Sequence, residues 1–247
     1  MRVFALIVLM ALTGCVSSGA VPVSNTKMAE GYYMKGLSYL QSKDYERASV
    51  EFNRAIQTDS KNKQAYYGLG LISDYQGKLD DAQKYYVRAI DEDSDFADAY
   101  NALGVVYAKQ QKWKEAIKAF NKALSNKLYT TPHFAYLNLG DVYMEQKDYE
   151  KAVEAYRDSK RFVILDGTIY KLGSALIEAG KIKEAIRELT EGVRISPQNA
   201  TMRYALALAF LKDGNKKAAL TEFKSAVQLE PKSEIARKAN DYIRTLR

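Results

Sequence analysis

Groups able to do covalent or metal chemistry are scarce in this chain of 247 residues. It contains one cysteine, Cys15, and one histidine, His133. With no second thiol and no second imidazole, the sequence offers neither a Cys-His pair nor a Ser-His-Asp triad. Zinc, which proteins usually hold with Cys and His, has no ligand set. We therefore expect His133, which follows Pro132, to lie at the surface or at the start of a helix, and we expect no metal.

An acidic run from Asp91 to Asp95 is the other candidate for chemistry. Alternating aspartates suggest a calcium loop, but that loop needs Gly at its sixth place and Glu at its twelfth. Phe96 and Ala102 hold those places. Aspartate also caps helices and forms turns, so we expect a turn between two helices here. No insertion is large enough to build a cleft around paired carboxylates, and the sequence therefore predicts neither an enzyme, a cofactor nor a small-molecule substrate.

Cys15 closes an apolar segment at the start of the chain. Arg2 precedes an unbroken apolar run over residues 3–12, which ends in the residues LTGC. Such a run is typical of a secretory signal and is shorter than the roughly 20 residues that span a bilayer. Its ending resembles the lipobox of bacterial lipoproteins. The resemblance implies that Cys15 becomes the first residue of the mature chain and carries acyl chains such as palmitate.

We accordingly expect a lipoprotein signal peptide over residues 1–14 and a lipidated, flexible tether over residues 15–28. Residues 16–28 read VSSGAVPVSNTKM, a segment of small and polar residues with a reach of about 20 Å. Two or more acyl chains make membrane attachment stable. The formal net charge of +7 is spread along the chain and forms no basic block, which argues against nucleic-acid binding.

A small residue that follows an apolar one recurs at nearly constant spacing. Its members are Gly36, Gly70, Gly104, Gly140, Gly173 and Ala207, and the intervals between them are 34, 34, 36, 33 and 34 residues. This is the period of the tetratricopeptide repeat, a helix-turn-helix unit of 34 residues. Alanine recurs twelve positions after each small residue, and a large residue follows four positions later; it is aromatic in every unit but the fifth.

The sequence thus predicts an all-α fold, a right-handed solenoid of six tetratricopeptide repeats over residues 29–247. The expected units are 29–62, 63–96, 97–130, 133–166, 166–199 and 200–233. Residues 234–247 have the pattern of an amphipathic helix, which is expected to cap the last hairpin.

The first helix of each repeat is expected to line a concave groove. Its fifth position carries Tyr33, Tyr67, Asn101, Leu137, Tyr170 and Tyr204, and its ninth position begins with Leu37, Leu71 and Val105. The groove is apolar and aromatic over the first three units and more polar beyond them. Tyrosine offers a large contact area at little rotamer entropy, so we expect a hydrophobic protein segment to bind there. An alternative is that these tyrosines only cover the helices behind them.

The whole plan resembles the outer-membrane pilotins of type IV pilus systems, the family of PilF, PilW and Tgl. The most specific match is residues 121–152, where two extra residues bring in Tyr129-Thr130-Thr131-Pro132 ahead of Asn138-Leu139-Gly140. Two features depart from the family: Asp141 replaces an apolar neighbour, and Gly192 stands where alanine is usual.

The resemblance implies a role in assembly. A pilotin binds a secretin subunit, carries it to the outer membrane and helps it form its multimer. Val16, where an aspartate would favour the inner membrane, implies a lipid-anchored protein on the periplasmic face of the outer membrane. The alternative is a lipoprotein adaptor that recruits periplasmic proteases or cell-wall hydrolases, whose sequence would look much the same.

Overall fold

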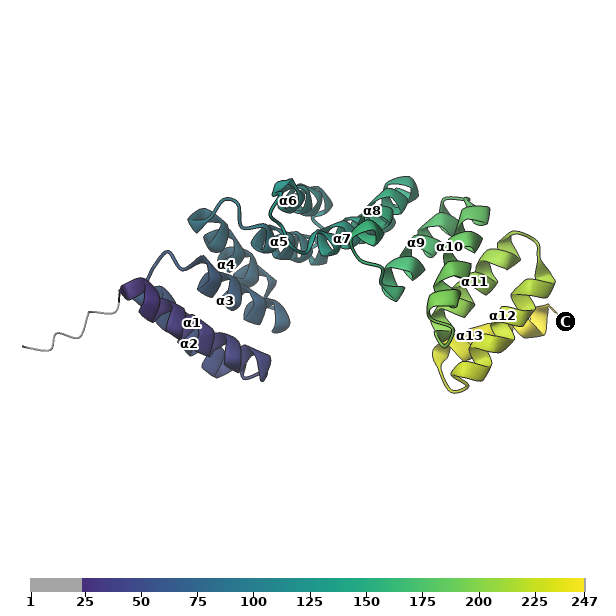
Figure 1. The fold of residues 1–247 in the computed structure, drawn as a ribbon, viewed down its shortest axis with the longest axis horizontal. Helices are drawn as coiled ribbons and strands as arrows, with labels where there is room; N and C mark the ends of the chain where they lie inside the picture. Colours follow the sequence, from purple (N-terminus) through teal and green to yellow (C-terminus); the bar gives the residue numbers. More distant parts are fainter. Residues whose placement is uncertain (1–23, 247) are drawn as a thin grey trace, which may run out of the picture.

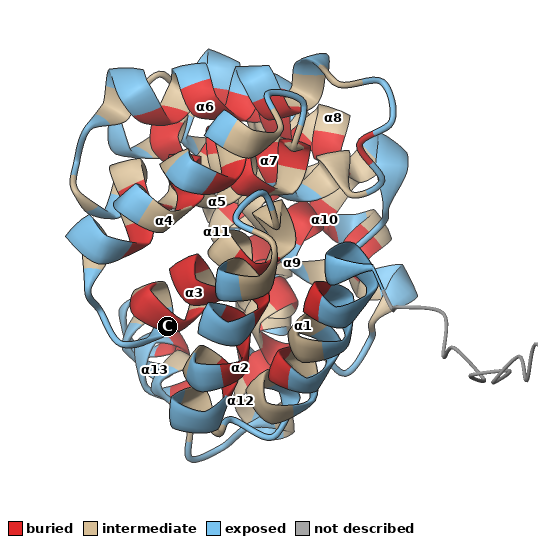
Figure 2. Ribbon diagram, turned by 90° about the vertical axis from the view of Figure 1, so that its left-hand side faces the viewer, coloured by how far each residue is buried: buried red, intermediate tan, exposed pale blue. Residues whose placement is uncertain are grey.

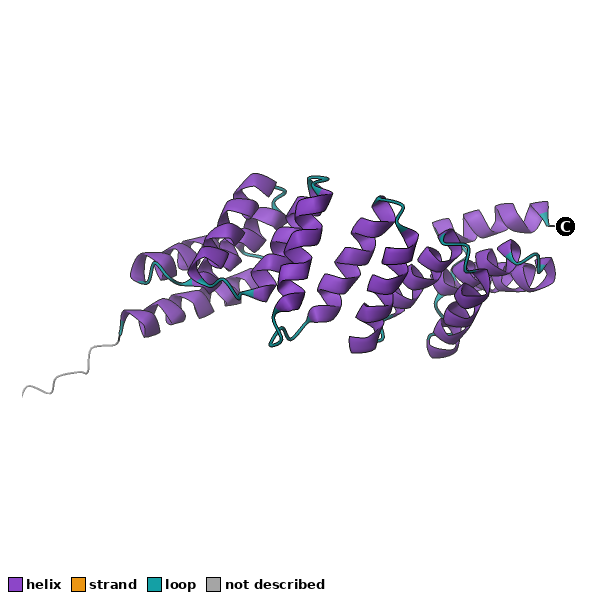
Figure 3. Ribbon diagram, turned by 90° about the horizontal axis from the view of Figure 1, so that it is seen from above, coloured by secondary structure: helices purple, strands orange, loops and turns teal. Residues whose placement is uncertain are grey.

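The computed structural model describes residues 24–246, and these form a curved row of helical hairpins (Figures 1 and 3). Cys15 and the expected signal peptide lie outside the described residues. The helices of the described part are α1 Asn25–Gln41, α2 Tyr45–Thr58, α3 Lys63–Tyr75, α4 Leu79–Glu92, α5 Ala97–Lys109, α6 Trp113–Ser125, α7 Pro132–Glu145, α8 Tyr149–Phe162, α9 Asp166–Glu178, α10 Ile182–Ile195, α11 Ala200–Lys212, α12 Lys216–Leu229 and α13 Glu234–Thr245.

Each repeat is one antiparallel pair of an odd-numbered and an even-numbered helix, and α13 packs on α12 at the end of the row. Successive odd-numbered helices also pack on one another, most loosely between α7 and α9, whereas the even-numbered helices do not pack closely on one another. The odd-numbered helices therefore lie on the inner side of the curve. The predicted all-α solenoid of tetratricopeptide repeats is confirmed.

Two helix starts differ from the boundaries expected from the sequence. α1 begins at Asn25, inside the expected tether of residues 15–28, because the hydroxyl of Ser24 accepts the backbone N–H of Lys27 and caps the helix. α7 begins at Pro132 itself. Proline is tolerated there, since the first turn of a helix has no acceptor for its missing N–H.

The recurring glycines are required by close contact with a ring or a branched side chain. A Cβ on Gly104 would lie 2.5 Å from the ring of Phe120, and the corresponding glycines of units one, two, four and five meet a large side chain in the same way. Each of these contacts lies within one hairpin, and Phe52 alone also meets a glycine of the next unit, Gly68. The large residue thus meets the glycine of its own repeat, and it also packs in a cluster with residues of the next repeat.

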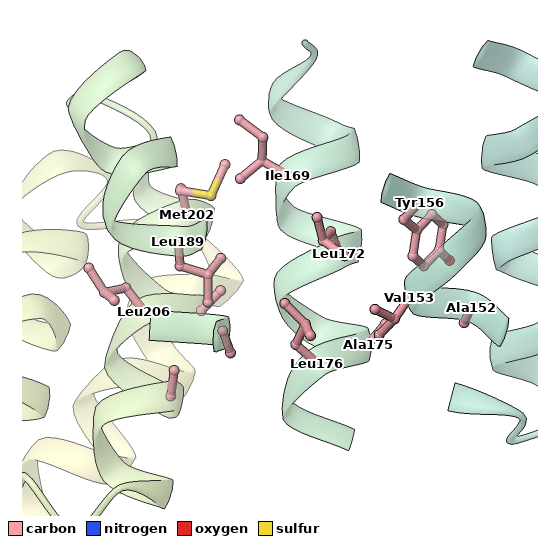
Figure 4. Packing of buried hydrophobic residues seen from close by; sticks show 13 residues of the cluster. Ala152, Val153, Tyr156, Ile169, Leu172, Ala175, Leu176, Leu189, Met202 and Leu206 are labelled. Atoms are coloured by element: carbon pink, nitrogen blue, oxygen red, sulfur yellow. The ribbon is translucent and has the colours of Figure 1, made fainter. Parts of the chain in front are cut away.

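Buried side chains of the described residues form a series of clusters along the row. Figure 2, which looks along the row, shows buried and exposed residues alternating on the helices. The largest cluster joins α8, α9, α10 and α11, with Tyr156 at one end and Leu206 at the other (Figure 4). Each cluster links neighbouring repeats. The stability of this fold is therefore expected to be close to a sum over repeats and the interfaces between them.

The two irregular small residues have structural reasons. A Cβ on Gly192 would lie 2.8 Å from the sulfur of Met202, so the glycine makes room for a larger side chain from α11. Ser159, where most other units have alanine, is buried and its hydroxyl donates to the carbonyl of His133 at 2.9 Å. Neither residue disturbs the stacking. Within residues 24–246, no helix is long and apolar enough to cross a membrane.

Candidate functional site

The fifth position of the inner helices carries three half-buried tyrosines that lie on the aromatic core of their own repeats. Tyr33 lies 5.9 Å from Phe52 and Tyr204 lies 5.6 Å from Phe223, between ring centroids. Tyr67 contacts two rings, because its ring centroid lies 5.7 Å from that of Tyr86 and 5.3 Å from that of Phe96. Each ring therefore covers the core behind it and keeps one edge on the inner surface.

Burial raises the pKa of Tyr33 and of Tyr204, and it raises the pKa of Tyr67 further, with a smaller contribution from the charge of Asp98. These hydroxyls consequently stay protonated over the physiological range. They are able to donate a hydrogen bond to a bound main chain, which is a suitable role at the edge of an apolar groove.

The ninth-position residues lie beside these tyrosines. Leu37 packs on the cluster that contains Phe52, Leu71 on the cluster of Tyr86, and Val105 on the cluster of Phe120. All three are only partly buried. The inner surface of α1 and α3 thus presents two tyrosine-leucine pairs, one from each repeat.

Polar links replace the apolar pairs in the middle of the inner surface. Asn138 donates an amide hydrogen bond to Asn101 at 3.0 Å. The carboxylate of Asp141 accepts the hydroxyl of Tyr156 at 2.7 Å and an ion pair from Lys171 at 2.5 Å. This ion pair joins α7 to α9, the successive inner helices with the fewest close backbone contacts. Asp141, the departure noted in the sequence, thus connects two repeats.

The last two expected groove residues differ from each other. Leu137 is partly buried against the cluster of α8 and α9. Tyr170 is 37 % exposed and is the most exposed member of the row. Together, the structure places all nine expected residues on inner helices, and Tyr33, Leu37, Tyr67 and Leu71 lie partly buried on α1 and α3, two helices that contact each other.

The extra residues between the third and fourth units form an anchor. Tyr129 is 8 % exposed and packs between α6 and α7. The ring of His133 lies against Phe134, at 4.1 Å between centroids, at the start of α7. Within the described part of the chain, no three His, Cys, Asp or Glu residues gather as a metal site would require.

Asp98, at the start of α5, is an inner-face carboxyl whose pKa is raised by burial, with Thr131 acting in the opposite direction. A raised pKa means that the folded state favours the protonated form of Asp98. The resulting contribution to stability is fully present at pH values below the ordinary pKa of 3.8, and it is lost as the pH rises through the pKa of the folded state. We expect Asp98→Asn to be more stable than the wild type at pH 7 and equally stable below that ordinary value. Urea unfolding at the two pH values measures this, and a less stable variant at pH 7 would contradict the assignment.

The acidic run 91–95 covers the end of α4 and the turn after it, where the sequence predicts a turn. One oxygen of Asp93 accepts the backbone N–H of Asp95 at 2.9 Å, and the other pairs with Lys63 of the preceding inner helix. The Lys63 pair and the turn hydrogen bond lower the pKa of Asp93. The run therefore links α3 to the turn that follows α4.

The connection between α8 and α9 is an apolar turn that sequence analysis missed. Phe162, Val163, Ile164 and Leu165 are all exposed, although every other connection between units is mainly polar. Phe162 stacks on Tyr136 at 5.8 Å. A run of four apolar residues outside the repeat pattern is visible in the sequence, but a buried segment would give the same signal.

Because Ile164 is 59 % exposed, its replacement by alanine is expected to change the free energy of unfolding by less than about 0.5 kcal/mol. The matched variant Ile169→Ala, five residues later in a fully buried position, is expected to lose about 3 kcal/mol. Urea unfolding of both variants checks the assignment. Equal losses would show that the turn is packed in solution.

Comparison with known proteins agrees with the geometry. Models described as tetratricopeptide repeat match residues 29–62, 74–129 and 170–234, together more than half of the chain. A model described as anaphase-promoting complex, cyclosome, subunit 3 matches residues 109–192. No curated protein matches the sequence.

Similar solved structures include two type IV pilus proteins. PilF of Pseudomonas aeruginosa is 20 % identical, with a TM-score of 0.76, over 89 % of this chain and 99 % of its own. PilW, a widely conserved type IV pilus biogenesis factor, is 22 % identical, with the same TM-score, over 87 % of this chain and 99 % of its own. YrrB, a tetratricopeptide-repeat protein with an unusual peptide-binding site, is 22 % identical over 77 % of this chain and 97 % of its own, with a TM-score of 0.65. The chain is a tetratricopeptide-repeat protein, and its solenoid has the same fold as PilF and PilW.

Proposed function

We propose that this protein acts as a pilotin, which binds a secretin subunit through its inner surface and assists its multimerisation at the outer membrane. The observation that carries the proposal is the partial exposure of Tyr33, Leu37, Tyr67 and Leu71 on the neighbouring inner helices α1 and α3. These residues are too exposed to be wholly core, and they combine apolar area with hydroxyl donors, as binding surfaces for protein segments do.

Further support comes from the extent of the fold match. The structural likeness to the two type IV pilus proteins covers nearly the whole of each of them, not one repeat module. The peptide-binding site of YrrB shows that a related solenoid binds peptides. The proposal places the described repeats in the periplasm, with Cys15 as the lipid anchor in the outer membrane.

The test is a double variant of the first repeat, Tyr33→Ala with Leu37→Ala. It removes contact area without placing a charge next to the core. Alanine in place of two central contact residues is expected to weaken partner binding by at least about 30-fold. Heat-resistant secretin multimers and surface pili should then fall to the level of a gene deletion, while the amount of the protein stays unchanged.

Val50→Ala is the matched control, because Val50 is 49 % exposed in the same repeat but lies on the outer helix α2. It should leave multimers and pili normal. Tyr67→Glu is a poor test, since Tyr67 packs on both Tyr86 and Phe96 and the new charge would destabilise the fold. Normal multimers in the Tyr33 and Leu37 double variant would contradict the proposed surface, and normal multimers and pili in the deletion would favour the adaptor role.

A further inference from the structure

A pocket of about 320 Å³ is lined by α5, α6 and α7, where the inner surface changes from apolar to polar. Its lining includes the apolar side chains of Val105, Ala108 and Trp113. Lys109, Asp141 and Glu145 are charged residues of the same lining. The lining therefore combines apolar side chains, including an indole, with charged groups.

The charges of the pocket leave one carboxylate in excess. Lys109 is neutralised by Asp74, with nitrogen-oxygen distances of 2.6 and 2.8 Å. Asp141 is neutralised by Lys171. Glu145 is exposed and makes no ion pair within the described part of the chain. Burial raises the pKa of Tyr156, and the negative charges of Asp141 and Glu145 raise it further. The electrostatic potential at this point is therefore negative.

We propose that this pocket binds a basic side chain, arginine or lysine, of the protein segment that occupies the inner surface. The aliphatic stem of such a side chain fits against Val105 and Ala108, as long cationic side chains cover apolar surface while their charge stays near water. The cationic group then lies near Glu145 and beside the indole of Trp113, which attracts cations by its ring face. Two independent features of the pocket, its charge and its aromatic wall, select the same ligand chemistry.

The inference rests on the proposed protein-binding role of the inner surface, but not on the identity of the partner. It adds a chemical requirement to the bound segment: apolar residues for the surface of α1 and α3, and a basic residue where the segment crosses α5 and α7. A segment without a basic residue leaves the carboxylate of Glu145 uncompensated, so the pocket gives selectivity as well as affinity.

The chain provides its own reporter, because Trp113 is its only tryptophan. The experiment titrates the purified protein with N-acetyl-arginine amide and follows the fluorescence of Trp113. N-acetyl-citrulline amide is the control ligand, since it has nearly the same shape but no charge. A single residue as ligand is expected to bind with a dissociation constant on the order of millimolar. The uncharged analogue should bind at least about 10-fold more weakly.

Variants locate the interaction. Glu145→Gln should weaken the response to arginine amide about 5-fold or more, since it removes the unpaired charge. Glu154→Gln is the matched control, because Glu154 is also exposed but lies on the outer helix α8. It should titrate as the wild type does.

Equal responses to arginine amide and citrulline amide, or wild-type binding in Glu145→Gln, would contradict the proposal that the pocket binds a basic side chain. This readout is separate from the test of the pilotin role. Loss of the arginine response leaves the secretin experiment unaffected, and normal multimers in the Tyr33 and Leu37 variant leave the arginine response in place.

Discussion

A Phe120→Ala variant is expected to lose about 4 kcal/mol of its free energy of unfolding. Phe120 is fully buried, and its ring lies directly on the backbone of α5 at Gly104. No other side chain fills that space, so truncation leaves a cavity in the cluster that joins the third and fourth repeats. The matched control is Leu128→Ala, eight residues later, which is 86 % exposed and should change stability by less than about 0.5 kcal/mol.

Urea unfolding is best followed by two signals, because long repeat arrays do not always unfold in one step. Circular dichroism reports on all the helices. Trp113 fluorescence reports on the third repeat, since Trp113 begins α6, the helix that carries Phe120. The loss should therefore be at least as large in the fluorescence transition as in the circular dichroism transition. An unchanged fluorescence midpoint would contradict the assigned packing.

A double-mutant cycle tests the reason for the glycine. Gly104→Val alone should destabilise the protein by about 1–3 kcal/mol, because its side chain would overlap the ring of Phe120. In the Phe120→Ala background the same valine partly fills the cavity, so the double variant should be at least about 1 kcal/mol more stable than the sum of the single losses. Additive losses would show that glycine is not required there by the ring.

The contact between Gly104 and Phe120 also explains why the fold could be predicted from the sequence. Within a hairpin, a glycine and an aromatic residue sixteen positions later must meet for the two helices to pack, so the spacing itself records the contact. The turns behave differently: Lys43, Gly77, Gln111, Lys147, Gly180 and Gly214 all have positive φ at the equivalent place, but only three of them are glycine. The requirement for positive φ recurs in each repeat, and the residue type records it in only half of them.

Contacts between repeats are less visible in the sequence. Gly192 seemed irregular when only its own helix was considered, but its partner is Met202 of the next repeat. The degree of burial of Tyr67 similarly depends on Phe96, which comes from the turn after the next helix. A pattern that repeats every 34 residues predicts the position of a side chain on a helix, but it does not predict how much of that side chain the neighbouring repeat covers.

The pocket beside Trp113 shows the same limit. Val105 was expected in the groove from its register alone, whereas Glu145 and Lys109 stand at a position that varies between units. The ion pairs Lys109–Asp74 and Lys171–Asp141 determine which charge of the pocket is left without a partner. Those pairs join residues 35 and 30 positions apart, and one sequence does not reveal which lysine pairs with which carboxylate.

Replacement of Cys15 by serine is expected to abolish lipid attachment completely. The first acyl group of a lipoprotein is joined to a thiol, and Cys15 is the only thiol in the chain. Each buried methylene contributes about 0.8 kcal/mol to membrane binding, so the loss of two or more acyl chains removes far more free energy than any surface contact replaces. Labelled palmitate should be absent from the variant, and the protein should move from the membrane fraction to the soluble fraction.

Val16→Asp provides the matched control, because the change lies next to Cys15 and leaves the thiol in place. This variant should still incorporate labelled palmitate, but by the sorting pattern that the lipobox implies it should move to the inner membrane. Under the proposed pilotin role, secretin multimers at the outer membrane should then be lost in both variants, although the sequence of the repeats is unchanged. Palmitate on Cys15→Ser, or normal multimers in that variant, would contradict the anchor, since the repeats would then reach the secretin without it.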